Sequence, residues 1–184
     1  MPHEIDTPSP WVVRWAPLMP KGTVLDLACG RGRHARHLAG LGHEVVAVDR
    51  DAEALAALKG LPHIRAVRAD LENGDPWPFA KRRFAGIVCT NYLHRPLLPA
   101  LADALQTGGV LIYETFMQGN ERHGKPSNPA FLLGRGELYD VFSARLEVLA
   151  FEQGEQHTPK PGTAQRICAQ RRLGSVPESA KMES

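Results

Sequence analysis

A short glycine-rich turn carries the residues of this sequence that are best suited to bind a ligand. Gly30 and Gly32 follow the apolar run 24–28, where a strand must turn tightly into a helix, and a side chain at either position would block a ligand's approach. The helix that follows offers free N–H groups and the positive end of its dipole. Asp49 closes the next apolar run, at a spacing that suits a carboxylate binding the two hydroxyls of a ribose.

The glycines alone leave two cofactors open, because Gly30-x-Gly32-x-x-Ala35 with a later acid also fits the NAD fingerprint. Three features favour S-adenosylmethionine. Asp26 lies inside the first strand, where a dinucleotide fold usually has an apolar residue. The chain is expected to end in an antiparallel hairpin, unlike the dinucleotide topology, and 184 residues leave no second domain for a dehydrogenase substrate. An NAD-dependent reductase is therefore the least favoured alternative.

Strands and helices alternate along the chain around this turn. Apolar runs predict strands, and segments with helical spacing of apolar residues predict helices. The predicted strands are 23–28, 45–48, 64–69, 84–90 and 110–116, and the predicted helices are 10–19, 33–40, 51–59, 96–106 and about 136–142. This alternation predicts an α/β fold with a mostly parallel sheet and helices on both faces. Residues 146–151 and 164–170 lack an intervening helix and predict a hairpin with an antiparallel last strand.

The run Leu25-Asp-Leu-Ala-Cys-Gly-Arg-Gly32 resembles motif I of the class I S-adenosylmethionine-dependent methyltransferases. The resemblance covers about residues 21–173 and implies a doubly wound, mostly parallel seven-stranded sheet with an antiparallel C-terminal hairpin. It also implies S-adenosyl-L-methionine as cofactor and S-adenosyl-L-homocysteine as product. Gly30-Arg-Gly-Arg33 is most similar to the tellurite-resistance-type methyltransferases and their bacterial relatives. Those commonly have asparagine where this sequence has His34, which is a departure.

The resemblance implies a contact for each part of the cofactor. The backbone of residues 28–32 would hold the methionine part, Asp49 the ribose hydroxyls, and Arg50 would flank the adenine. Asp70 would contact the adenine amino group, and Asn91 would lie near the amino-acid end and the methyl group. The expected cofactor-binding residues are Asp26, Ala28, Cys29, Gly30, Gly32, Arg33, Asp49, Arg50, Asp70, Leu71 and Asn91.

The residues after the fourth strand are the candidates for catalysis. Methyl transfer is an in-line displacement, so the protein mainly aligns donor and acceptor and excludes water. Asn91, Tyr92 and His94 are the predicted catalytic residues, since ligands of such sheets bind at the carboxyl ends of strands. Packing is an equal alternative for Tyr92 and His94. Tyr113 and Glu114 lie near the same edge, and core packing is favoured for Tyr113.

The long irregular stretch 115–138 predicts a lid over the cleft. Arg122, His123 and Lys125 would make this lid basic and favour an anionic acceptor. Glycines near position 119 and at 134–136 are the expected hinges.

Composition predicts one globular domain, residues 1–173, with an N-terminal helical cap at 1–20 and a disordered tail at 174–184. The scattered cysteines predict neither disulfides nor a zinc site, and a reduced, cytoplasmic setting is expected. His34 and His37 lack a third ligand, so they are interpreted as surface or packing residues and no metal is expected. Neither a membrane span nor a secretory signal is recognisable.

The chemistry of the acceptor is narrowed mainly by what the fourth strand lacks. It ends Cys89-Thr-Asn-Tyr92 instead of Asn-Pro-Pro-Tyr, and no Pro-Cys follows, which disfavours adenine-N6, glutamine-amide and cytosine-C5 methylation. A net charge of +2 without a basic stripe disfavours a nucleic acid. The leading hypothesis is a methyltransferase that acts on a small, perhaps anionic, molecule. The alternative is a cofactor-binding module without catalysis that acts through a partner, and no oligomeric state is predicted.

Overall fold

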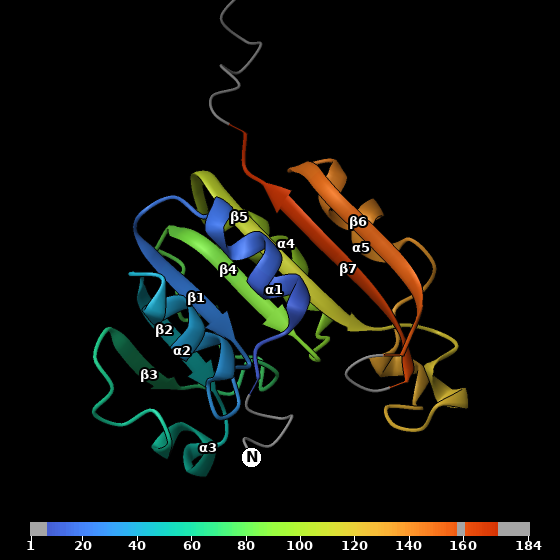
Figure 1. Ribbon diagram of the computed structural model, residues 1–184, viewed down its shortest axis with the longest axis horizontal. Helices are drawn as coiled ribbons and strands as arrows, with labels where there is room; N and C mark the ends of the chain where they lie inside the picture. Colours follow the sequence, from blue (N-terminus) through green and yellow to red (C-terminus); the bar gives the residue numbers. More distant parts are fainter. Residues whose placement is uncertain (1–6, 158–160, 173–184) are drawn as a thin grey trace, which may run out of the picture.

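A seven-stranded sheet with the order β3-β2-β1-β4-β5-β7-β6 forms the centre of the molecule (Figure 1). The computed structural model describes residues 7–157 and 161–172. Strands β1 to β5 are parallel, and β7 pairs antiparallel with both β5 and β6. The strands are β1 Thr23–Leu27, β2 Glu44–Asp49, β3 Ile64–Arg68, β4 Phe84–Thr90, β5 Leu105–Phe116, β6 Glu147–Gln156 and β7 Gly162–Gln170. The predicted doubly wound sheet and its antiparallel hairpin are confirmed.

Helices cover both faces of the sheet, as the continuous apolar strands predict. Side chains of α1, α2 and α3 pack on one face with Val24 and Val88, and side chains of α4 and α5 pack on the other with Leu25 and Ile87. Figure 1 shows α1 and α2 in front of the sheet and α4 and α5 behind it. The helices are α1 Pro10–Trp15, α2 Arg33–Gly40, α3 Ala52–Ala56, α4 Leu98–Asp103 and α5 Glu137–Ser143.

Three predicted helices are shorter in the structure than in the sequence-based interpretation. The predicted helix 10–19 is α-helical only to Trp15 and continues as a 3-10 turn at Ala16–Leu18. The predicted helix 96–106 begins as a 3-10 turn at Arg95–Leu97 and ends at Asp103. Leu105, fully buried, pairs with Phe84 and already belongs to β5, so sheet pairing overrides the helical pattern there. The predicted helix 51–59 is limited to α3, which Asp51 caps by accepting from two backbone N–H groups.

The N-terminal helix begins where the sequence predicts. The Ser9 hydroxyl accepts a hydrogen bond from the Trp11 N–H at 3.2 Å, with Pro10 at the first helical position. The Trp11 indole N–H donates to the Ile167 carbonyl of β7, which fixes α1 across the centre of the sheet. Residues 7–9 thereby reach the carboxyl ends of the parallel strands.

Several expectations concern residues or properties outside these elements. The predicted tail 174–184 and the first six residues of the N-terminal cap lie outside the described residues. Within the described part of the chain, no helix is long and apolar enough to cross a membrane. Within the same ranges, no group of three or more histidine, cysteine or acidic side chains is arranged to hold a metal ion.

Candidate active site

The turn after β1 is shaped by two glycines that serve different purposes. Gly30 has a φ of +54°, and a Cβ atom there would enter open space, so its backbone is accessible to a ligand. Its N–H donates to Asp49 Oδ2 at 2.8 Å. Gly32 has a φ of +75°, and a Cβ atom there would overlap the Leu58 side chain. The expectation of a ligand path therefore fits Gly30, whereas packing against Leu58 requires Gly32.

Two residues at the carboxyl ends of neighbouring strands have strained backbones. Ala28 follows β1 with a φ of +52°, and Asn91 follows β4 with a φ of +54°. Such conformations cost about 1–3 kcal/mol each in a residue other than glycine, and they cluster at functional sites. The order of the parallel strands reverses between β1 and β4, which is where open α/β sheets bind ligands.

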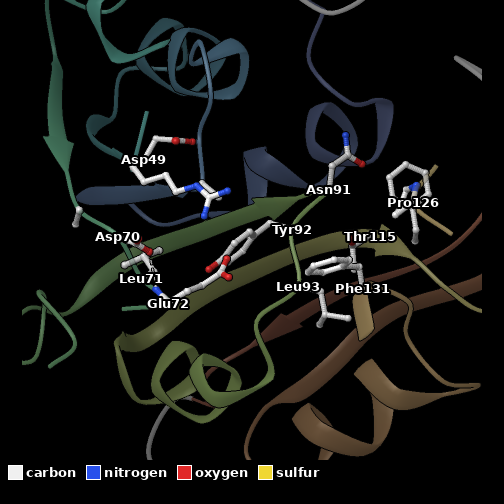
Figure 2. Close-up of a pocket in the computed structure, with 14 residues that line it drawn as sticks. Asp49, Asp70, Leu71, Glu72, Asn91, Tyr92, Leu93, Thr115, Pro126 and Phe131 are labelled. Carbon is white, nitrogen blue, oxygen red and sulfur yellow. Dashed lines mark hydrogen bonds between the residues drawn. The ribbon is translucent and has the colours of Figure 1, made fainter. Parts of the chain in front are cut away.

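A cavity of about 440 Å³ opens at the ends of β2, β3 and β4 (Figure 2). Three carboxylates and one guanidinium face it, so we call it the acidic cavity. Its lining consists of Ala28, Asp49, Arg50, Ala69, Asp70, Leu71, Glu72, Asn91, Tyr92, Leu93, Thr115, Phe116, Pro126 and Phe131.

The carboxylates of the acidic cavity are oriented by backbone N–H groups. Asp49 accepts from Gly30 through one oxygen and from the Asp51 N–H through the other, at 2.9 Å. Asp70 accepts from the Glu72 N–H at 2.9 Å. Each carboxylate retains lone pairs for a further donor, so the cavity can accept several hydrogen bonds from one ligand.

Tyr92 points across the acidic cavity toward Glu72 (Figure 2). Burial, followed by the nearby Glu72 carboxylate, raises the pKa of the Tyr92 hydroxyl well above its usual value. The phenol therefore stays protonated at neutral pH. Tyr92 can donate a hydrogen bond, but it is not suited to act as a general base.

A second cavity, of about 630 Å³, lies on the other side of Ala28 and Asn91. Three arginines and one carboxylate face it, so we call it the basic cavity. The two cavities share Ala28, Asn91 and Phe116. The basic cavity is lined by Thr7, Pro8, Ser9, Pro10, Trp11, Ala28, Cys29, Gly30, Arg31, Arg33, His34, Thr90, Asn91, Glu114, Phe116, Gln156, Pro161 and Arg166.

The N-terminal segment forms one wall of the basic cavity, and His34 holds it there. The Ser9 N–H donates to His34 Nε2 at 3.1 Å, and the Ser9 hydroxyl donates to Glu114 Oε1 at 2.8 Å. His34 is buried, and desolvation lowers its pKa to about 3, so the ring is neutral. Of the two interpretations, surface or packing, the structure favours packing: His34 is a buried hydrogen-bonding residue beside a cavity.

An ion pair lies at the far end of the basic cavity. Arg166 Nε is 2.7 Å from Glu114 Oε2, and the two residues are register partners on β7 and β5. Arg166 also donates to Gln156 and lies 3.7 Å from Glu152. Sequence reasoning missed Arg166, because only the antiparallel pairing of β7 with β5 brings it to the site.

Most of the predicted cofactor residues line one of the two cavities. Asp49, Arg50, Asp70 and Leu71 line the acidic cavity, Cys29, Gly30 and Arg33 line the basic cavity, and Ala28 and Asn91 line both. Asp26 and Gly32 line neither. Asp26 is buried and accepts from the Ala35 N–H at 2.8 Å, which fastens α2 to β1. Burial raises the pKa of Asp26 to about 7.

The predicted catalytic residues are separated by the structure. Asn91 lines both cavities and Tyr92 lines the acidic cavity, whereas His94 lines neither and precedes the 3-10 turn Arg95–Leu97. Tyr113 is buried and its hydroxyl donates to the Tyr92 carbonyl at 2.7 Å, which agrees with the packing interpretation.

The segment predicted as a lid contributes apolar side chains to the site. Pro126 and Phe131 line the acidic cavity (Figure 2). Arg122 and His123 face Glu155 instead, at 3.5 and 4.0 Å. None of the three predicted basic residues lines either cavity.

This strand order, the glycine-rich turn after β1 and the acid that ends β2 define the class I S-adenosylmethionine-dependent methyltransferase fold. A methyltransferase domain family matches residues 24–109, from β1 into β5. Residues 24–109 therefore resemble a methyltransferase domain, and the whole sheet has the fold of this class. The class, and S-adenosylmethionine as the cofactor that belongs to it, agree with the sequence-based prediction.

Solved structures of similar fold include TehB from Haemophilus influenzae, with a TM-score of 0.71 and 21% identity. The match covers 88% of this chain and 61% of TehB, so the chain spans under two thirds of that protein. A TehB-like methyltransferase from Corynebacterium glutamicum has a TM-score of 0.62 and 22% identity, with 88% of each chain covered. A Methanosarcina mazei methyltransferase has a TM-score of 0.69 and 16% identity, with 91% and 100% covered. No curated protein sequence matches the chain.

Proposed function

We propose that this protein transfers the methyl group of S-adenosylmethionine to a small molecule. The observation that carries the proposal is the meeting of an acidic and a basic cavity at the strained residues Ala28 and Asn91. The adenosine part of the cofactor would lie in the acidic cavity, and its amino-acid end would reach Gly30 in the basic cavity. The acceptor would approach through the remainder of the basic cavity.

The residues of the acidic cavity fit the adenosine part. Asp49 has unused lone pairs for the two ribose hydroxyls, and Asp70 has them for the adenine amino group. Leu71 provides an apolar surface for the ring, and Gly30 leaves its backbone open toward the amino-acid end. The excess of carboxylates also suits a cofactor that carries a sulfonium cation.

When bound, the cofactor supplies an electrophilic methyl group, and the chain's task is to align the acceptor and exclude water. Asn91, shared by both cavities, would orient the two partners. A small acceptor with anionic character is favoured by Arg166 in the basic cavity, in place of the predicted basic lid. The buried free thiols of Cys29, Cys89 and Cys168 support a reduced, cytoplasmic setting.

Isothermal titration with S-adenosylhomocysteine tests this function. The wild-type protein is expected to bind with a micromolar dissociation constant, and Asp49→Ala is expected to weaken binding at least about 100-fold, or about 2.7 kcal/mol. Asp103→Ala is the matched control, because this aspartate pairs with Arg145 on the surface, away from both cavities.

Two outcomes would contradict the proposal. One is that the wild-type protein does not bind S-adenosylhomocysteine. The other is a thermal shift with NADH and none with S-adenosylmethionine, which would favour the reductase. If the protein binds S-adenosylhomocysteine, a screen for methyl transfer to tellurite, selenite, thiols and small carboxylates would distinguish an enzyme from a binding module.

A further inference from the structure

Three neighbouring strands place three polar side chains in a row at the basic cavity. Asn91 follows β4, Glu114 lies on β5 and Arg166 lies on β7, and all three line the cavity. Glu114 is the register partner of Thr90 on one side and of Arg166 on the other. Because neighbouring strands are about 4.8 Å apart, a molecule entering from the junction at Asn91 meets first a carboxylate and then a guanidinium.

The Glu114–Arg166 pair is largely withdrawn from solvent and still able to bind a ligand. The side chains are 13% and 24% exposed, and their 2.7 Å contact fixes both in position. Glu114 also accepts from Ser9, and Arg166 donates to Gln156. A carboxylate has about four lone-pair sites and a guanidinium five N–H donors, so each group can take a further partner.

We propose that this pair recognises the acceptor, and that the acceptor is a small amino or hydroxy acid. Its nucleophilic nitrogen or oxygen faces Glu114, next to the junction, and its carboxylate faces Arg166. This inference rests on the proposed function and names the substrate class of that same site.

Methyl transfer to this acceptor forms one bond and breaks one. The lone pair of the acceptor nitrogen or oxygen forms the bond to the methyl carbon, and the carbon–sulfur bond breaks with its electron pair left on sulfur. The product is neutral S-adenosylhomocysteine. The proton leaves the methylated atom for the Glu114 carboxylate.

Simpler acceptors fit the row of side chains less well. An anion without an N–H or O–H group would bring its charge against Glu114 without donating to it. An amine without an acid would leave Arg166 without a ligand partner. Arg31 and Arg33 lie beside Gly30, at the end assigned to the cofactor's own carboxylate, so Arg166 is the arginine left for the acceptor.

The test measures how tightly candidate acceptors bind to the protein when it is saturated with S-adenosylhomocysteine. A panel of small amino and hydroxy acids is titrated together with analogues that lack one group; β-alanine, propylamine and propionate form one such set. At least one amino or hydroxy acid is expected to bind at least about tenfold more tightly than both of its analogues, or about 1.4 kcal/mol. Arg166→Gln should abolish the preference for the amino or hydroxy acid over the amine or alcohol. Glu114→Gln should abolish its preference over the simple acid.

Arg122→Gln is the matched control, because it changes an arginine that also faces a glutamate, Glu155, but outside both cavities. Its acceptor preferences should equal those of the wild type. Each variant should bind S-adenosylhomocysteine within about twofold of the wild-type affinity, which would show that its fold and cofactor site are intact. If Arg166→Gln does not fold, Arg166→Lys carries the test: it keeps the cation but not the fork, and should weaken binding of the amino or hydroxy acid.

Three results would overturn the inference. The analogues could bind as tightly as the amino and hydroxy acids, no panel member could bind, or folded Arg166→Gln could lose S-adenosylhomocysteine binding. In each case, binding of S-adenosylhomocysteine by the wild-type protein would leave the proposed function standing. Failure of that binding would instead refute the proposed function.

Discussion

The acidic and basic cavities share the strained residues Ala28 and Asn91 and differ in charge and in construction. The acidic cavity has three carboxylates and one guanidinium in its lining, and the basic cavity has three guanidiniums and one carboxylate. The acidic cavity is built mainly from residues that directly follow β2, β3 and β4. The basic cavity combines the glycine-rich turn and the start of α2 with the N-terminal segment and with residues of β5, β6 and β7. The difference teaches that strand ends alone build most of the acidic cavity, whereas the basic cavity also requires distant parts of the chain.

The largest expected effect comes from Gly30, which lines the basic cavity and donates a hydrogen bond to Asp49 of the acidic cavity. Gly30→Val places a side chain in the open space of the turn and strains a backbone with a φ of +54°. We expect S-adenosylhomocysteine affinity to fall at least about 1,000-fold, or about 4 kcal/mol, with the loss measured by titration calorimetry.

Gly32→Ala is the counterpart for this comparison. Its Cβ atom would overlap Leu58, so it should lower the free energy of unfolding by about 2 kcal/mol and affect binding less than Gly30→Val. Equal losses of binding in the two variants would contradict the division of roles between the glycines.

The buried groups behind the turn should oppose each other in their dependence on pH. Asp26 has a folded pKa of about 7, above its usual 3.8, so its stabilising contribution is full below about pH 4 and is lost as pH rises through 7. His34 has a folded pKa of about 3, below its usual 6.5, so its contribution is present above 6.5 and is lost as pH falls through 3.

Urea unfolding of Asp26→Asn and His34→Gln over this range separates the two contributions. The wild-type free energy of unfolding minus that of Asp26→Asn should fall between about pH 4 and pH 7, on the order of 3 kcal/mol. The difference from His34→Gln should rise by a similar amount. A difference that is constant with pH would show that the corresponding group is not buried as described.

Ser9 tests whether the wall of the basic cavity is independent of the cofactor side. Ser9→Ala removes the cap of α1 and the hydrogen bond to Glu114. We expect a loss of about 1 kcal/mol in unfolding free energy, with S-adenosylhomocysteine affinity within about twofold of wild type. Ser127→Ala, at an exposed position, is the control. A large loss of cofactor affinity in Ser9→Ala, but not in Ser127→Ala, would show that the two cavities do not act independently.

The smallest effect is expected from the residues that sequence analysis placed on the lid. Replacing Arg122, His123 and Lys125 by alanine should change cofactor and acceptor affinity less than about twofold, because none of them lines a cavity. Phe131→Ala is the comparison within the same segment, since Phe131 lines the acidic cavity. If acceptor affinity falls more in the triple variant than in Phe131→Ala, the basic residues of this segment bind the acceptor, as the sequence analysis predicts.

The parallel strands and the polar residues at the ends of β2 and β4 could be predicted from local sequence. Polar residues that line the acidic cavity lie at the ends of apolar runs, as Asp49 ends β2 and Asn91 follows β4, so the strand and the cavity residue are encoded together. The end of α4 could not be predicted in this way, because the pairing of Leu105 with Phe84 decides it. The burial of His34 could not be predicted either, because its hydrogen-bond partner, the N–H of Ser9, is distant in the sequence.

By itself, the sequence determined the alternation of strands and helices, the glycine-rich turn and the acids beside it, because periodicity and turn chemistry act over short distances. Only the tertiary structure decided that Gly32 serves packing, that Asp26 is a buried support, and that Ser9, Glu114 and Arg166 meet. Antiparallel pairing of β7 with β5 and the docking of α1 bring those three together. Contacts between residues so far apart depend on the packing of the whole chain, which no local pattern encodes.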